Sequence, residues 1–370
     1  MSWFVKFYCM VMVRYSNKRN IDTQLIVSIA AVFCVCLSNL SYAQNYFFSQ
    51  YRATPLIVSP ALAGYEDHIY FGINYRLQNQ AEISYQTAQF AAILPLNVQG
   101  QEKNHLGGIG ISAVSDVAGE FNEVKTYGFS FASAYNMKLD QYDIQMITFG
   151  LQASYTQTGI DFGSLNWPSQ ITYKGFDHSI VPSEQYSDQI NYISFNAGAM
   201  WSYDSRNKRR SVHNDYRLQL GVSVANLNQP DYSLIEGQIN NLPMLYKAHG
   251  GGIFEVNEDV RIAPDFLVMM QNQNFQYNIG TSLSYTTAGK SGTKFENTGI
   301  SMRLGTWYRI QDSFVFLIGA SNENFDAAVS YDINASSDRA NIRSQGAFEL
   351  SVAFKIQRDN SLKKIETPLY

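Results

Sequence analysis

Five histidines are the residues of this chain that could bind a metal ion or act as a general base. They are His68, His105, His178, His213 and His249. A metal site needs ligands that converge, and no two of these histidines lie within one helical turn or at alternate positions of one strand. We therefore expect no metal site and interpret each histidine as a strand-end or loop residue.

Serine residues could act as nucleophiles if the chain were a phospholipase embedded in a membrane. Such an enzyme needs a serine beside a histidine on the lipid-facing wall, with an Asn or Asp that orients the histidine. The candidates all share the polar phase of their segments, and none is paired with a histidine in a neighbouring register: Ser130, Ser154, Ser223, Ser282 and Ser284. We expect neither an enzyme nor a bound cofactor.

The three cysteines, Cys9, Cys34 and Cys36, all lie within the first 43 residues. Lys18 and Arg19 precede an apolar run from residue 25 to residue 37, which matches a secretory signal and is too short to cross a membrane as a helix. Small residues before the expected cleavage point predict a signal peptide over 1–43, with the mature chain starting at Gln44. Disulfides, thiolate catalysis and cysteine metal sites are thereby excluded from the mature chain.

Charge makes nucleic acid an improbable partner of the mature chain. The leader holds four of the 27 Lys and Arg residues and one of the 31 Asp and Glu residues, so the mature chain has a net charge of −7. It offers no basic surface of the kind that binds phosphates.

Alternating apolar residues dominate the rest of the sequence. Residues 69–77 place Ile, Phe, Ile, Tyr and Leu at every second position, with polar or small residues between them. Alternate side chains of a strand point to opposite faces, so each such segment has one apolar wall and one polar wall. Repeated about fourteen times behind an export signal, this pattern predicts an all-β protein over 67–357, an antiparallel outer-membrane β-barrel with lipid outside and a polar lumen.

The fourteen strands are predicted at 68–80, 82–95, 105–116, 121–139, 142–160, 190–204, 213–226, 244–257, 259–271, 273–288, 297–310, 312–321, 325–333 and 343–357. The two longest connections, 161–189 and 227–243, follow odd-numbered strands and are expected on the outer side. Residues 358–370 form a basic tail after the last strand.

Residues 44–66 fit neither the leader nor the barrel wall. Pro55 and Pro60 interrupt any ladder or helix, and the segment has no period of two. Its many apolar side chains exclude a solvated tail. We expect an ordered, non-strand segment that packs in the lumen as a plug or against a periplasmic partner.

Several motifs of the chain resemble a known family. The opening motif comprises Gln44, Ser49-Gln50-Tyr51, Pro55-Leu56 and residues 59–64, and further matches are Tyr75 to Gln78, Gly107 to Gly110, Gly150 to Ala153, Gly221 to Pro230, His249 to Gly252 and Gly346 to Leu350. Together they resemble the PorP/SprF family of outer-membrane proteins of the type IX secretion system. Ser59, Leu62 and Asn79 depart from the residues usual in that family.

The resemblance implies a secretion component in the outer membrane of a Gram-negative bacterium and not a catalyst. It implies outer-membrane lipid, periplasmic secretion subunits, and a secreted cargo such as a large adhesin as partners, and it associates the chain with gliding motility. The main rival is a porin or hydrophobic-solute channel; a soluble exported β-protein is a third alternative.

Partner contacts are expected in two places, the opening segment and the long connection at 161–189. Aromatic residues in a long loop on a rigid scaffold are common binding sites, although such a connection is equally often a plain surface loop. The residues predicted to bind partners are Phe48, Ser49, Gln50, Tyr51, Pro55, Leu56, Pro60, Gly64, Trp167 and Tyr173.

Overall fold

The structure is a computed structural model. It describes residues 47–65, 67–80, 83–97, 105–120, 122–141, 144–161, 168–173, 175–177, 179–180, 189–205, 215–233, 238–257, 259–287, 299–335 and 344–356. The predicted signal peptide, the predicted tail and Trp167 lie outside these residues. Within them, no helix is long and apolar enough to cross a membrane.

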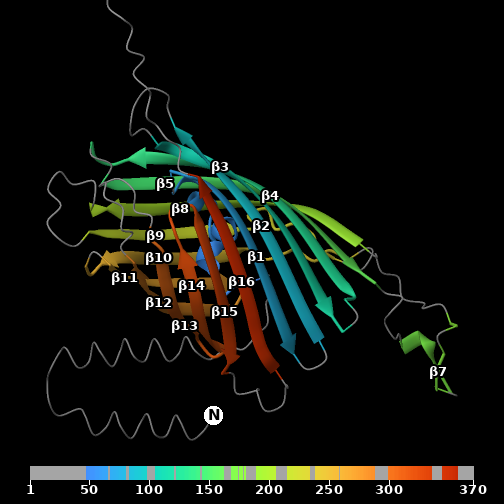
Figure 1. Cartoon of the computed structure of the whole chain (residues 1–370). Helices are drawn as coiled ribbons and strands as arrows, with labels where there is room; N and C mark the ends of the chain where they lie inside the picture. Colours follow the sequence, from blue (N-terminus) through green and yellow to red (C-terminus); the bar gives the residue numbers. More distant parts are fainter. Residues whose placement is uncertain are drawn as a thin grey trace, which may run out of the picture. The chain divides into compact units, whose positions relative to one another are not determined.

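Fourteen antiparallel strands among the described residues form a closed barrel, in which β1 pairs with both β2 and β16 (Figure 1). This confirms the predicted fold class, and each predicted strand overlaps an observed one. The strands are β1 (Ile69–Gln80), β2 (Ile83–Asn97), β3 (His105–Gly119), β4 (Val124–Lys138), β5 (Gln145–Ile160), β8 (Gln189–Asp204), β9 (Tyr216–Ala225), β10 (Leu245–Glu255), β11 (Val260–Gln271), β12 (Asn274–Thr286), β13 (Ser301–Arg309), β14 (Ser313–Ser321), β15 (Phe325–Asn334) and β16 (Ser344–Ile356).

The two walls of the barrel follow the predicted phases. In β1, Phe71, Ile73 and Tyr75 are exposed on the outer face, whereas Asn74 and Arg76 are buried on the lumenal face. In a soluble protein this ring of exposed aliphatic and aromatic side chains would face water. On a barrel it forms the apolar band that faces lipid.

The two ends of the barrel differ in their connections. We call the end at which β1 begins and β16 finishes the terminus end, and the opposite one the loop end. The connections between β5 and β8 and between β9 and β10 both lie at the loop end. Long loops of bacterial barrels usually lie on the extracellular side, so a periplasmic position of the terminus end stays a prediction.

The first of these long connections contains a small hairpin. A 3-10 turn, η4 (Pro168–Gln170), leads into β6 (Ile171–Thr172) and β7 (Gly175–Phe176), which pair with each other in a separate two-stranded sheet.

The second long connection, between β9 and β10, begins with an asparagine side chain that hydrogen-bonds to the backbone of β8. β8 continues beyond the last residue of β9, so the edge of β8 would be left unpaired there. Asn228 fills this position: its Oδ1 accepts from Phe195 N–H at 3.0 Å and its Nδ2 donates to the Ile193 carbonyl at 2.8 Å. The asparagine-rich motif at 226–229 therefore replaces part of a missing strand.

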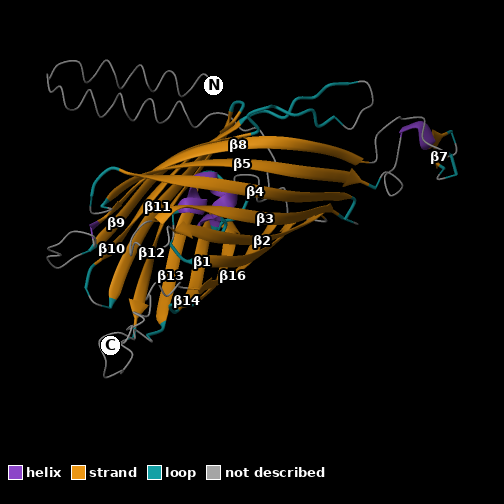
Figure 2. Cartoon of the chain, turned by 90° about the horizontal axis from the view of Figure 1, so that it is seen from above, coloured by secondary structure: helices purple, strands orange, loops and turns teal. Residues whose placement is uncertain are grey.

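Residues 47–65 lie inside the barrel, and we call them the plug. They form the 3-10 turn η1 (Tyr51–Ala53), the one-turn helix α3 (Pro55–Val58) and the 3-10 turn η2 (Pro60–Gly64), all surrounded by strands (Figure 2). Pro55 and Pro60 occupy first positions of helical turns, where a missing N–H has no consequence. The predicted non-strand segment is thus an ordered element of the lumen.

Candidate functional site

Eight of the ten residues predicted to bind partners lie in the plug. Phe48, Leu56 and their neighbours face the lumenal wall, and only Pro55 of the eight is half-buried while the others are buried. Tyr173 lies in the β6–β7 turn and is 93% exposed. The predicted set is therefore split between an internal group and an external one.

The first anchor of the plug is a carboxylate on β16. Glu349 accepts from two successive backbone N–H groups, Ser49 at 2.6 Å and Gln50 at 2.9 Å. Glu349 is 1% exposed, so its charge requires compensation by hydrogen bonds and a cation. Arg76, which lies opposite Glu349 on β1, supplies that cation.

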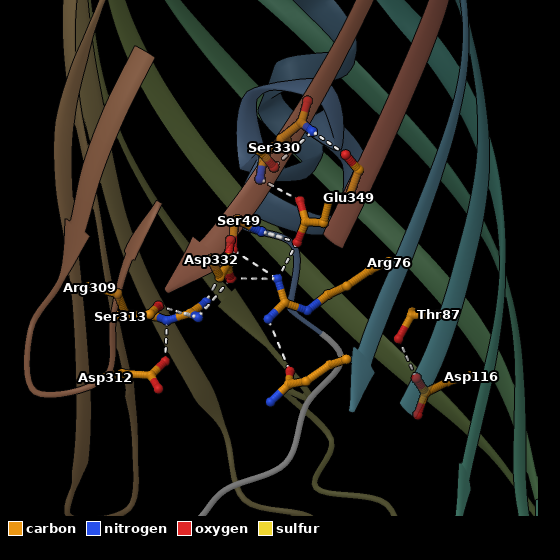
Figure 3. Close-up of polar contacts among 12 residues, drawn as sticks. Ser49, Arg76, Thr87, Asp116, Arg309, Asp312, Ser313, Ser330, Asp332 and Glu349 are labelled. Atoms are coloured by element: carbon orange, nitrogen blue, oxygen red, sulfur yellow. Dashed lines mark hydrogen bonds and ion pairs between the residues drawn. The ribbon is translucent and has the colours of Figure 1, made fainter. Parts of the chain in front are cut away.

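A second carboxylate joins Ser49 to the same ionic cluster (Figure 3). The Ser49 hydroxyl donates to Asp332 at 2.5 Å and accepts from Arg76 Nη1 at 2.8 Å. Arg309 also reaches Asp332, at 3.0 Å, and its guanidinium lies 5.0 Å from the centre of the Phe47 ring. Two arginines thus balance two buried carboxylates, and the plug hydroxyl lies among them.

The Gln50 side chain extends this contact along the wall. Its Nε2 donates to Ser330 Oγ at 3.0 Å, while its Oε1 accepts from Ser351 at 2.6 Å. The pair Ser49-Gln50 is therefore bound through both its backbone and its side chains.

Asp265 on β11 forms the second anchor. It accepts from the Tyr51 hydroxyl, from Trp307 Nε1 at 2.6 Å and from Arg52 at 3.1 Å. Burial, together with the Asp265 carboxylate, raises the pKa of the Tyr51 phenol far above its usual range. The phenol consequently remains protonated and acts as a donor.

The backbone carbonyls of the short helical turns are satisfied by wall side chains. The Ala53 carbonyl accepts from Tyr70 at 2.9 Å and Asn74 at 3.0 Å, and the Val58 carbonyl accepts from Ser223 at 2.7 Å. Lys247 donates to the carbonyl of residue 57. Turns this short leave most carbonyls without an internal partner, so the wall completes them.

The last anchor lies near the terminus end. The Gly64 carbonyl contacts Asn136 Nδ2 and His105 Nε2, each at 2.8 Å. Contacts thus reach the plug from β1, β3, β4, β9, β10, β11, β13, β15 and β16, on all sides of the lumen.

Wall glycines let the plug approach closely. A Cβ atom on Gly150 would lie 2.3 Å from Ala61 N, and one on Gly108 would lie 1.9 Å from the Ala63 carbonyl oxygen. Both distances are too short for any side chain, so the glycine motifs of β3 and β5 form the seat of η2.

The wall residues that bind the plug were only partly foreseen. The alternation places Arg76, Arg309 and Glu349 in the lumenal phase, but no local pattern connects them with the plug or singles out Asp265 or Asp332. Buried charges in a lumenal phase are the signal that could have identified the anchors, since such charges need partners.

The interpretation of the histidines needs one correction. His249 lies within β10 and is 3% exposed, so the expectation of a strand-end or loop position is wrong for this residue. His178 and His213 lie outside the described residues. No group of three His, Cys, Asp or Glu side chains that could hold a metal is found in the described part of the chain.

Comparison with protein families gives one match that covers most of the chain. The family described as "Type IX secretion system membrane protein PorP/SprF" matches residues 40–354. A search of curated proteins found no match.

Solved structures similar to this chain include a hydrocarbon channel, a toluene transporter and a porin. The CymD monoaromatic hydrocarbon channel is 9% identical, with 86% of this chain and 95% of that chain covered and a TM-score of 0.44. The Pseudomonas putida toluene transporter TodX is 9% identical, with 84% and 94% covered and a TM-score of 0.44. The KdgM porin bound to oligogalacturonate is 9% identical, with 77% of this chain and 99% of that chain covered and a TM-score of 0.33. At 9% identity the similarity concerns the fold alone, and the ligands of these proteins are not assigned to this chain.

Proposed function

The chain belongs to the PorP/SprF family of type IX secretion system membrane proteins, and we propose that it is a non-enzymatic outer-membrane barrel needed for secretion or surface attachment of a cargo protein such as a large adhesin. The observation that carries this proposal is the plug. It is bound to strands on all sides of the lumen and lies in the path that a solute channel would keep open.

With the plug bound in the lumen, the two ends of the barrel are the surfaces that we assign to protein contacts. At the loop end, the β6–β7 hairpin presents Ile171 and Tyr173, which are 66% and 93% exposed. Large apolar side chains on a loop supported by a rigid barrel are typical contact residues. We assign this hairpin to the cargo, and we assign the terminus end to periplasmic subunits of the secretion system.

A deletion strain tests this function directly. We expect loss of one surface-displayed or secreted protein, restored by a plasmid copy of the gene, with unchanged uptake of small solutes. An unchanged surface and secreted proteome would contradict the proposal.

The channel alternative is tested separately with purified protein in planar bilayers. A lumen filled by the plug should give no large, stable conductance. Large and stable channels, together with altered solute uptake in the deletion strain, would favour a porin or hydrophobic-solute channel instead.

A further inference from the structure

The edge of β8 that faces β9 is longer than β9 itself. β8 pairs with β5 over residues 189–203, and in Figure 2 the two strands run side by side to the loop end. The pairing of β8 with β9 begins only at Ala197, opposite Val224. Residues 189–196, at the loop-end start of β8, therefore have a neighbouring strand on one side only among the described residues.

Alternate residues of β8 direct their backbone groups to opposite sides. In an antiparallel sheet, the N–H and C=O of one residue bond to one neighbouring strand, and those of the next residue bond to the other. Phe195 uses both groups on the β9 side: its N–H donates to Asn228 Oδ1 at 3.0 Å, and its carbonyl accepts from Leu227 N–H at 2.9 Å. Asn191 and Ile193, which precede it at steps of two, thus direct their backbone groups to the same edge.

The Asn228 side chain completes the part of this edge that is nearest to β9. Its Nδ2 donates to the Ile193 carbonyl at 2.8 Å, so the carboxamide makes the two bonds that a peptide group of a strand would make. The side chains of Ile193 and Phe195 are exposed on the outer face, in the apolar band. Unpaired backbone groups are costly in lipid, which explains why the edge is completed at this height.

Three backbone groups beyond Asn228 have no partner among the described residues. They are the N–H of Ile193 and the N–H and carbonyl of Asn191. The outward side chains change here from apolar Ile193 to polar, exposed Asn191, so these groups lie at the border of the apolar band. The described part of the β9–β10 connection pairs with itself and not with this edge, through a bridge between Asp231 and Asn241.

This edge has none of the usual protection against pairing with another strand. Proteins protect exposed edges with lysine, proline or a bulge. Residues 189–196 read Gln-Ile-Asn-Tyr-Ile-Ser-Phe-Asn, without charge, proline or glycine, and they pair with β5 without a register shift. The edge therefore has both the backbone groups and the sequence of a strand that can accept another strand.

We propose that an extended segment of the exported cargo protein adds a strand to β8 at Asn191 and Ile193. An extended backbone matches this row of groups, because it presents donors and acceptors at the spacing of a strand, whereas a helix or a lipid chain has no such row. The proposal rests on the proposed secretion function, which assigns the β6–β7 hairpin to the cargo. That hairpin belongs to the connection that leads into β8, so the strand site continues the same surface.

A proline at position 191 tests this site, with alanine at the same position as the matched control. Asn191→Pro removes the N–H that points to the edge and keeps the groups of Ile190 and Tyr192 that pair with β5. Asn191→Ala keeps the N–H and removes only the side chain. The readout is flow cytometry of the surface protein that the deletion strain loses, in cells with equal amounts of folded barrel.

We expect Asn191→Pro to lower surface display of this cargo severalfold and Asn191→Ala to leave it unchanged. Heat-dependent migration of the barrel on gels verifies folding. Equal display in the two variants would overturn the proposal, because the backbone N–H would then have no role of its own.

Cross-linking identifies the partner at the edge and decides the question even if Asn191→Pro does not fold. Cysteines lie only within the first 43 residues, which the predicted cleavage removes, so Asn191→Cys gives the barrel a single thiol. A benzophenone maleimide labels this thiol on intact cells. Lys125→Cys is the control, because Lys125 is exposed near the loop-end start of β4, a strand that is paired on both sides.

Irradiation should link position 191, and not position 125, to the protein that the deletion strain loses. An adduct between two barrels would show that a second copy of this chain occupies the edge, and it would overturn the proposal. Equal yields of cargo adduct at the two positions, or no adduct at position 191, would overturn it as well.

The strand site and the secretion function can fail separately. If the deletion strain loses its surface cargo and Asn191→Pro restores display fully, the strand site is refuted and the secretion function stands. If deletion leaves the surface and secreted proteomes unchanged, the secretion function is refuted, and the strand site falls with it.

Discussion

Tyr51 in the plug is 6% exposed and Tyr173 in the β6–β7 turn is 93% exposed, although the sequence marks both as aromatic residues of non-strand segments. The plug tyrosine donates to a buried carboxylate that two further side chains share. The hairpin around Tyr173 is built from only two short strands that pair with each other. The two segments therefore differ in what a side chain contributes.

In the plug, side chains hold the segment against the wall, and their loss should first affect assembly of the barrel. In the hairpin, side chains face outward, and their loss should first affect a partner. The same residue type thus has a structural role at one site and is available for recognition at the other.

The largest expected effect comes from Glu349→Ala, because it removes the acceptor for two plug N–H groups and leaves Arg76 with one fewer anion. Breaking a buried ion pair by removing one partner destabilises by about 3–5 kcal/mol. We expect a loss of this size in the free energy of unfolding, measured by urea titration of the purified barrel.

The control for Glu349 is Glu255→Ala. Glu255 pairs with Arg261 at 3.3 Å, but their side chains are 35% and 45% exposed, respectively. An exposed pair contributes about 0–1 kcal/mol. Similar losses for Glu255→Ala and Glu349→Ala would show that the plug does not depend on the ionic cluster.

An intermediate effect is expected for Gly150→Ala. The new Cβ atom would lie 2.3 Å from Ala61 N, so the plug or the wall must shift. Overpacking of this kind typically destabilises by about 1–3 kcal/mol. We expect lower stability together with faster proteolysis within residues 47–65, detected by limited digestion and mass spectrometry.

Gly319→Ala is the matched glycine control. The three atoms nearest to its added Cβ would all belong to the wall, the nearest at 2.9 Å. Gly319→Ala should therefore change the rate of proteolysis within residues 47–65 only slightly. Equal digestion of the plug in both variants would mean that Gly150 does not form its seat.

The barrel was predictable because its signal is local and repeated. Over residues 69–77 and 147–155 the outward residues are apolar, and the inward residues other than Tyr70 are small or polar, so the positions of β1 and β5 follow from sequence alone. Boundaries were less certain where the period fades: the predicted 121–139 becomes Val124–Lys138, and the predicted 297–310 becomes Ser301–Arg309.

The interior was predictable only in outline. The apolar load of residues 44–66 implies burial, but it does not select the partners. Ser49 meets Glu349 and Asp332 across about 300 and 283 positions of the sequence. Contacts at such separation depend on barrel closure, and a local pattern contains no information about them.

The smallest effect on stability, and the largest on recognition, is expected for Tyr173→Ala. Substitution of an exposed side chain usually changes stability by less than about 0.5 kcal/mol. If the hairpin contacts cargo, however, truncating an exposed aromatic anchor should reduce surface display of that cargo severalfold, on the scale of a hot-spot residue. Flow cytometry of cells that carry equal amounts of folded barrel measures this. Tyr51→Ala should give the opposite pattern, with less folded barrel but normal display per folded molecule. If Tyr173→Ala leaves display unchanged, the hairpin is a plain surface loop, and the difference between the two tyrosines is one of burial alone.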